Sequence, residues 1–119
     1  MLRGISLVIA VQDLELSSRF YQDQLGFTAR EIEDPGWRFF ERDNVLIMAG
    51  ECADTVPASE LGDHSYIAYI KVDDARELYQ ELTEQGVTIV KQLCDEAWGM
   101  REFGIRTLDG HRIMFAQQL

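Results

Sequence analysis

The sequence predicts an α+β fold in which two βαβββ modules form a cup-shaped mixed sheet. Two halves of the chain resemble each other, and each half holds one helix pattern among four strand-like runs. A length of 119 residues is too short for a second independent core. We therefore expect one domain, residues 1–119, made of modules 1–50 and 65–119 that are joined by a linker at 51–64.

The internal repeat relates residues 11–48 to residues 72–114. The separation of matching residues drifts only from 58 to 66 positions, as changes in loop length would produce. The matched pairs include Tyr21 with Tyr79, Gly26 with Gly86, Arg38 with Arg101, Phe40 with Phe103, and Met48 with Met114. Two copies of one structural unit are the simplest explanation of this pattern.

The first module opens with an apolar, β-branched run, which is typical of a strand. Asp13 follows where a side-chain oxygen can cap the start of a helix, and Gly26 stands where a left-handed residue ends it. Asp43-Asn44 is the predicted turn of the last hairpin, because both residues tolerate positive φ. The predicted strands are Ile5–Val11, Phe27–Glu33, Trp37–Arg42 and Val45–Gly50.

The second module repeats this order. Asp73 or Asp74 is the predicted helix cap, and Gly86 the predicted end of the helix. Between them, Ala75, Leu78, Tyr79 and Leu82 follow the spacing of one apolar helix face. The predicted strands are Tyr66–Val72, Val87–Leu93, Met100–Thr107 and His111–Gln117, with a turn at Asp109-Gly110. The intervening polar segment Glu51–Asp63, with Pro57 and Gly62, is the predicted linker.

Charge and composition limit the classes of partner that the protein is expected to bind. Eleven basic residues against 21 acidic ones give a net charge of −10, which repels phosphate backbones and argues against nucleic acid. The charge suits a cationic ligand, or simply a solvated acidic surface. No apolar run reaches the ~20 residues of a membrane span, and no signal peptide is visible, so we expect a cytoplasmic protein without a membrane partner. The two cysteines, Cys52 and Cys94, form no CxxC motif or disulfide framework.

Three segments resemble the vicinal oxygen chelate superfamily, which includes glyoxalase I, extradiol dioxygenases and bleomycin resistance proteins. They are VQDLELSSRFYQDQLGF, YIKVDDARELYQEL and WGMREFGIRTLDGHRIMF. The resemblance covers nearly the whole chain and is strongest to the bleomycin-resistance-like members. It implies the βαβββ fold and a homodimer, in some members with exchanged modules, but it leaves the activity open.

The resemblance also locates the positions at which many enzymes of this superfamily hold a divalent metal. Here these positions are Ser6, Met48, Ile67 and Met114. A hard divalent cation requires oxygen or nitrogen donors, which this set lacks almost entirely. His64 and His111 have no spacing that pairs them in a metal site. We therefore expect no metal, no other cofactor and no catalytic residue at this place.

The two tryptophans are the strongest candidates for ligand contact. Trp37 and Trp98 begin matching strands, where the resemblance to bleomycin resistance proteins implies stacking on the planar part of a drug. Alternatively, they cover the edges of a small core. The methionines would give an apolar, adaptable floor, or would simply fill the core. Arg101 and Glu102 are adjacent in a strand and so point to opposite faces. The predicted ligand-binding residues are Trp37, Trp98, Met48, Met114, Ser6 and Arg101.

The leading hypothesis is a metal-independent protein that binds a small planar, possibly cationic molecule, in the manner of drug-sequestering resistance proteins. The alternative is a glyoxalase-like metal-dependent lyase, isomerase or dioxygenase. A third hypothesis is an interaction module whose cup is filled by its own side chains.

Overall fold

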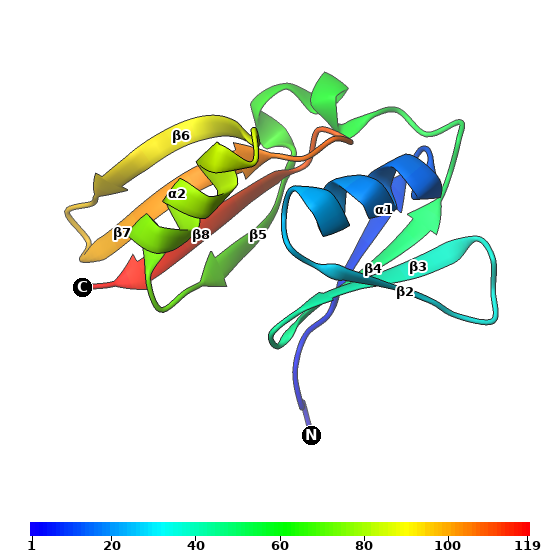
Figure 1. Ribbon diagram of the computed structural model, residues 1–119, viewed down its shortest axis with the longest axis horizontal. Helices are drawn as coiled ribbons and strands as arrows, with labels where there is room; N and C mark the ends of the chain where they lie inside the picture. Colours follow the sequence, from blue (N-terminus) through cyan, green and yellow to red (C-terminus); the bar gives the residue numbers. More distant parts are fainter. The chain divides into compact units, whose positions relative to one another are not determined.

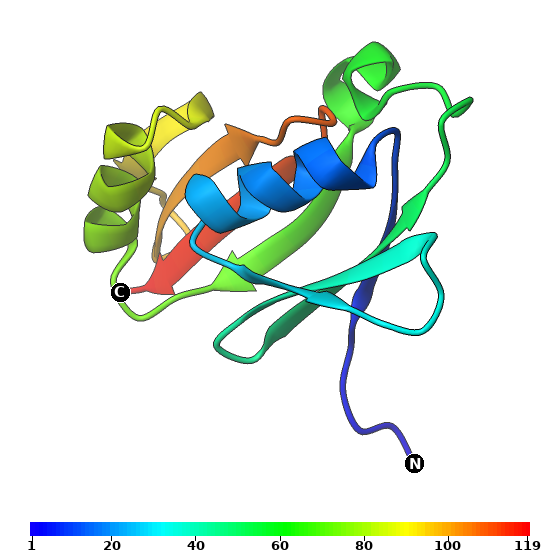
Figure 2. The same ribbon diagram turned by 45° about the vertical axis from the view of Figure 1, so that its right-hand side comes forward.

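The computed structural model describes residues 1–119, apart from the side chain of Asp63. The chain divides into two compact units, residues 1–57 and 58–119. Each unit packs one helix on a four-stranded mixed sheet (Figures 1 and 2). The predicted pair of βαβββ modules is therefore confirmed, and each module builds a sheet of its own.

The first unit has the sheet order β1-β4-β3-β2. Strand β1 runs parallel to β4, whereas β3 is antiparallel to both β4 and β2. Helix α1 provides the crossover between β1 and the hairpin strands. The elements are β1 (Leu7–Val11), α1 (Leu14–Asp23), β2 (Thr28–Glu31), β3 (Trp37–Arg42) and β4 (Val45–Glu51).

The second unit repeats this arrangement in the order β5-β8-β7-β6. Strand β5 is parallel to β8, and the remaining pairs are antiparallel. A short 3-10 segment, η1, precedes the sheet. The elements are η1 (Ala58–His64), β5 (Tyr66–Lys71), α2 (Ala75–Glu84), β6 (Thr88–Asp95), β7 (Met100–Arg106) and β8 (Arg112–Gln118).

The helices begin at predicted capping residues, and the two predicted glycines follow them. The Asp13 carboxylate accepts a hydrogen bond from the backbone N–H of Leu16 at 3.1 Å, and the Asp74 carboxylate accepts one from Glu77 at 3.0 Å. These bonds satisfy N–H groups that the first helical turn leaves free. Asp74, rather than Asp73, is therefore the second cap. Gly26 and Gly86 have φ of 74° and 78°, the left-handed conformation expected after each helix.

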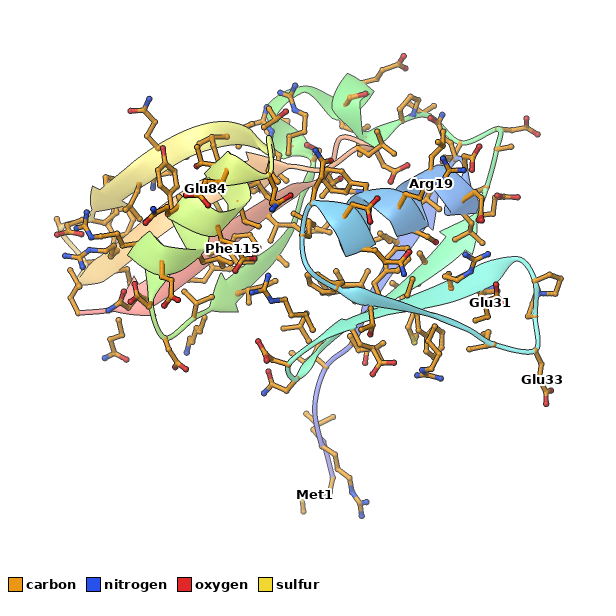
Figure 3. The ribbon with its side chains drawn as sticks, viewed as in Figure 1. Met1, Arg19, Glu31, Glu33, Glu84 and Phe115 are labelled. Carbon is orange, nitrogen blue, oxygen red and sulfur yellow. The ribbon has the colours of Figure 1, made fainter. Side chains whose placement is uncertain are left out.

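Aromatic rings between helix and sheet form the core of each unit. In the first unit, the fully buried Tyr21 of α1 stacks on Phe40 of β3, with ring centroids 4.4 Å apart. In the second, Tyr79 of α2 meets Phe103 of β7 edge-on at 5.1 Å, and Phe103 stacks on Phe115 of β8. Figure 3 shows Phe115 on the strand beside α2. Because strand residues alternate, Phe103 and Phe115 fix which face of the second sheet carries α2.

The predicted linker is partly regular structure. Glu51 is the last residue of β4, and residues 58–64 form η1, which is broken at Gly62 by a φ of 64°. The segment packs tightly, because a Cβ on Gly110 in the β7–β8 turn would collide with the backbone of Ser59. In the part of the chain that the structure describes, no helix has the length and apolar character needed to cross a membrane.

Candidate functional site

Glu102 on β7 is the central residue of the candidate site. Its neighbour Phe103 faces α2, so the Glu102 side chain lies on the face opposite α2. The residue is only 3% exposed. A buried carboxylate loses much of its hydration, and it is tolerated only where other polar groups replace the lost water. The polar groups that contact Glu102 therefore identify the residues of the candidate site.

Two aromatic side chains donate hydrogen bonds to the same oxygen of Glu102. The indole Nε1–H of Trp98 donates to Oε1 at 3.0 Å, and the hydroxyl of Tyr69 donates to Oε1 at 3.3 Å. Trp98 lies in the turn between β6 and β7, and Tyr69 lies on β5. Desolvation and the nearby charge of Glu102 raise the pKa of Tyr69, which keeps its hydroxyl protonated as a donor. Both rings are thus attached by their polar atoms to one buried carboxylate.

A cation completes this arrangement. The Lys91 ammonium on β6 lies 3.5 Å from Oε2 of Glu102 and 2.8 Å from Oε1 of Glu96. It also lies over the indole ring of Trp98, 5.7 Å from the ring centroid. Partial burial alone would lower the pKa of Lys91, but the hydrogen bond to Glu96 and the charge of Glu102 raise it overall. We call these five residues, Tyr69, Lys91, Glu96, Trp98 and Glu102, the Glu102 cluster.

Met114 provides an apolar floor beside the cluster. It pairs in register with Tyr69 on one side and with Gly104 on the other, and residues paired in this way share a sheet face. A Cβ on Gly104 would lie 2.8 Å from the Met114 sulfur. Glycine at this position therefore leaves the space that the thioether fills. Met114 itself is buried.

Trp98 exposes much of its ring despite its hydrogen bond to Glu102. The residue is 65% exposed, and Gly99 after it adopts a φ of 87° in the tight turn. An exposed indole held by its Nε1–H offers a flat surface in a defined orientation. Such a surface binds planar groups by stacking and cations by cation–π attraction.

The first unit carries a related apolar surface on the face opposite α1. Trp37 pairs in register with Gly50, and its ring carbons lie 3.1 Å from where a Cβ on Gly50 would stand. Met48 pairs with Phe39 two residues along the same strands. Trp37, Phe39 and Met48 are all half-buried and share this face. Trp37 and Met48 thus share one face of the first sheet, and Met114 shares a face of the second sheet with Glu102, to which Trp98 donates its hydrogen bond.

Arg101 does not join these residues. Its guanidinium forms two hydrogen bonds with the Asp95 carboxylate, at 2.7 and 3.1 Å, on the face that carries α2. Arg101 and Glu102 thus occupy opposite faces, as strand alternation requires, and Arg101 lies on the face opposite the Glu102 cluster. Ser6 is exposed and precedes β1, two residues before Val8, which pairs with Met48.

Sequence reasoning singled out Trp98 and Met114 in the second unit but missed Tyr69, Lys91 and Glu96. The position of Glu102 could have been inferred from the sequence. If Phe103 belongs to the core under the helix, strand alternation places the neighbouring Glu102 on the opposite face of the sheet. Tyr69 was harder to find. A register shift between Tyr66 and Ala68 disturbs the alternation of β5, and it sets Tyr66 beside Arg112 and Tyr69 beside Met114.

The four positions that the family resemblance predicts for metal ligands do not fit a divalent metal. Ser6, Met48, Ile67 and Met114 offer one hydroxyl, two thioethers and a hydrocarbon, none of them a good ligand for a hard cation. Among the described side chains, no three or more His, Cys, Asp or Glu residues gather as metal ligands would. The two histidines differ in surroundings, since His64 is exposed and His111 is buried.

Neither cysteine has the surroundings of an activated nucleophile. The Cys94 thiol donates a hydrogen bond to Glu96 at 2.9 Å, and this bond raises the pKa of the thiol. A raised pKa disfavours the reactive thiolate. Cys52 is exposed at the end of the first sheet. The candidate site therefore presents a buried carboxylate, two polar aromatic rings and an apolar methionine, without an activated thiol.

Known proteins resemble this chain in sequence and in fold. A family profile described as the Glyoxalase/Bleomycin resistance protein/Dioxygenase superfamily matches residues 5–115. Bleomycin resistance proteins of Geobacillus stearothermophilus and Staphylococcus aureus are 32% identical, over all of this chain and 98% of theirs. A bleomycin-binding protein crystallised with bleomycin has a TM-score of 0.80 at 18% identity, covering 99% of this chain and all of its own. The bleomycin resistance determinant of transposon Tn5 has a TM-score of 0.81 at 18% identity, covering 98% of each chain.

Proposed function

The chain belongs to the glyoxalase/bleomycin resistance protein/dioxygenase superfamily, and from this premise we propose that it sequesters a bleomycin-like drug without using a metal. The resistance proteins to which it is 32% identical support a drug-binding, resistance-like role. The expected mechanism is reversible, stoichiometric capture, with no covalent step. The ligand is planar in one part and positively charged in another.

The Glu102 cluster is the observation that supports this proposal. A drug-binding site of this kind needs a flat surface for the planar group and an anion for the charge. Trp98 supplies the flat surface and Glu102 supplies the anion. The two side chains are joined by one hydrogen bond. Stacking or cation–π contact with such a ring contributes about 0.5–2 kcal/mol. Several such contacts are needed for tight binding, so we assign further contact to Tyr69 and Met114.

The apolar surface of the first unit offers a second place for ligand contact. Trp37 and Met48 lie on the same face of their sheet, so one ligand group can touch both. We include them in the proposed function as predicted ligand contacts, together with the exposed Ser6. Arg101 is left out because it faces α2.

Net charge assists capture of a cation. A protein with a charge of −10 attracts cations over a distance of about a Debye length, and this raises the rate of encounter at low salt. Glu33, after β2, points away from the ribbon into solvent, as expected for a residue of an acidic surface (Figure 3). The homodimer implied by the family resemblance stays a prediction, which light scattering tests.

Fluorescence titration with metal-free bleomycin tests the proposed function. In a Trp37→Phe variant, Trp98 is the only remaining tryptophan, so its emission reports on the proposed site directly. We expect saturable quenching in the presence of a chelator. A Trp98→Ala variant should bind about 2- to 30-fold more weakly, which is the affinity equivalent of losing one contact of about 0.5–2 kcal/mol.

Leu108→Ala is the matched control for this titration. Leu108 is another exposed apolar side chain, in the turn after β7, and it belongs to neither apolar surface. Its loss should leave bleomycin affinity unchanged. Binding that appears only after a divalent metal is added would contradict metal independence, and absence of quenching would overturn the role in sequestration.

A further inference from the structure

We propose that Lys91 is a built-in competitor for cationic ligands, because its ammonium occupies the cation site formed by Glu96, Trp98 and Glu102. A ligand cation must displace Lys91 before it can reach Glu102. This inference rests on the proposed function and deepens it, because it states which part of the ligand the site recognises.

The contacts of the Lys91 ammonium are those that a bound cation would make. Two carboxylate oxygens lie 2.8 and 3.5 Å from Nζ, and the indole ring of Trp98 covers a third side. Carboxylates together with an aromatic face are the usual surroundings of ammonium ligands in proteins. The protein's own side chain thus shows which chemical group the site accepts.

Charge within the cluster favours an additional or replacing cation. With both carboxylates ionised, Glu96 and Glu102 carry two negative charges and Lys91 one positive charge, which leaves a net charge of −1. Hydrogen bonds from Cys94 and Lys91 lower the pKa of Glu96, which keeps it ionised at neutral pH. If Lys91 swings away, two negative charges face the space that it leaves.

Exposure differs sharply between the Lys91 ammonium and the Glu102 carboxylate. Lys91 is 31% exposed at its side chain and carries its charge on a flexible four-carbon stem, so it can turn into solvent. Glu102 is 3% exposed and stays in place through its bonds from Trp98 and Tyr69. The carboxylate is therefore positioned for a cation whether or not Lys91 occupies the site.

The exposed ring of Trp98 sets the second requirement on the ligand. A cation that replaces Lys91 lies beside this indole, so a planar group attached through a short linker can stack on its exposed surface. The class of ligand is therefore a flat aromatic or heteroaromatic group with a compact cation on a flexible arm. A flat molecule without the cation would leave Lys91 where it is.

Two forms of bleomycin that share the planar part and differ only in a cationic tail are suitable probes. We compare their dissociation constants for the wild-type protein and for Lys91→Met, which keeps an apolar stem of similar length. The cationic form should bind about fivefold more tightly to Lys91→Met, equivalent to ~1 kcal/mol, and the tail-free form should bind both proteins equally.

Lys71→Met is the matched control, because Lys71 is the only other lysine of the chain and lies on β5 outside the cluster. It removes the same charge from the protein, so it reports the effect of net charge alone. A gain in affinity as large in Lys71→Met as in Lys91→Met would overturn the competitor role, as would a gain shared by both bleomycin forms.

A second measurement uses the unaltered protein and does not depend on the folding of a variant. Acetylation of Lys91 and Lys71 is followed by mass spectrometry with and without the cationic bleomycin. Displacement predicts that Lys91 is acetylated faster in the complex, while Lys71 is unchanged. Slower acetylation of Lys91 would overturn the inference but leave the proposed function intact, whereas failure of both bleomycin forms to bind the wild-type protein would overturn both.

Discussion

The indole Nε1–H of Trp98 donates a 3.0 Å hydrogen bond to Oε1 of Glu102, joining an exposed ring to a buried carboxylate. The two residues are four positions apart in sequence, in a turn and in the strand that follows it. Because Tyr69 of β5 donates to the same oxygen of Glu102, the indole is linked through this carboxylate to two strands of the sheet. The exposed part of the site is thereby preorganised.

Removal of the Glu102 carboxylate should destabilise the protein. Glu102→Ala takes the acceptor away from Trp98 and Tyr69 and the ion partner away from Lys91, so we expect a loss of about 1–3 kcal/mol in the free energy of unfolding. Glu102→Gln keeps an acceptor oxygen and should cost less. Urea denaturation measures both, and equal stability of the wild-type protein and Glu102→Ala would refute the structural role.

A methyl group at Gly104 should move Met114 and little else. The Cβ of Gly104→Ala would lie 2.8 Å from the sulfur, at the flexible end of the methionine side chain, which can rotate away. We expect a stability change of at most about 1 kcal/mol and a weaker affinity for bleomycin, because the apolar floor changes shape. An unchanged affinity would remove Met114 from the proposed ligand contacts.

Gly110 should be far less tolerant. It has a φ of 91°, and an added Cβ would collide with the backbone of Ser59, which cannot rotate away as a side chain can. Gly110→Ala should therefore cost about 3 kcal/mol or more. Gly99→Ala is the matched control, since Gly99 has a φ of 87° with nothing near its Cβ position, and about 1–2 kcal/mol is expected from strain alone. Similar losses of stability in the two variants would contradict this prediction, because they would show that η1 moves to accommodate the added methyl group.

His111 should make the fold sensitive to mild acid. Burial lowers the pKa of His111, an effect that the charge of Asp109 partly offsets. The unfolded chain, with a histidine pKa of about 6.5, then binds more protons than the folded chain as pH falls below that value, so stability is lost on acidification. We expect the fall in melting temperature from pH 7.5 to 5.5 to be smaller in His111→Gln. The exposed His64 provides the control as His64→Gln, and an unchanged slope in His111→Gln would contradict the prediction.

Local signals in the sequence predicted the elements well. Strand β3 matches its prediction residue for residue, and the caps Asp13 and Asp74 lie where predicted, because capping and alternation depend on neighbours in sequence. Some strand ends differ, since β1 begins at Leu7 rather than at Ile5 and β2 covers only Thr28–Glu31, and the largest departure is η1. Its packing against Gly110 depends on a contact between distant residues, so the polar composition of this segment indicated only a linker.

The site was harder to predict than the elements, because it depends on register. Whether Lys91 reaches Glu102 is decided by the pairing of β6 with β7, and this pairing shifts on both sides of Lys91. Irregularities of this kind leave no clear mark in one sequence. Trp98 could be singled out by its residue type, but its carboxylate partner could be found only from the fold.

NMR spectroscopy of the two indole N–H groups provides the most direct test of the proposal that the exposed ring of Trp98 binds the drug. The chain has two tryptophans, so an amide correlation spectrum of labelled protein contains two indole signals, which Trp37→Phe and Trp98→Phe assign. In the presence of a chelator, metal-free bleomycin should shift the Trp98 signal until one molecule is bound per site. A Trp98 signal that stays in place at saturating bleomycin would contradict the central claim.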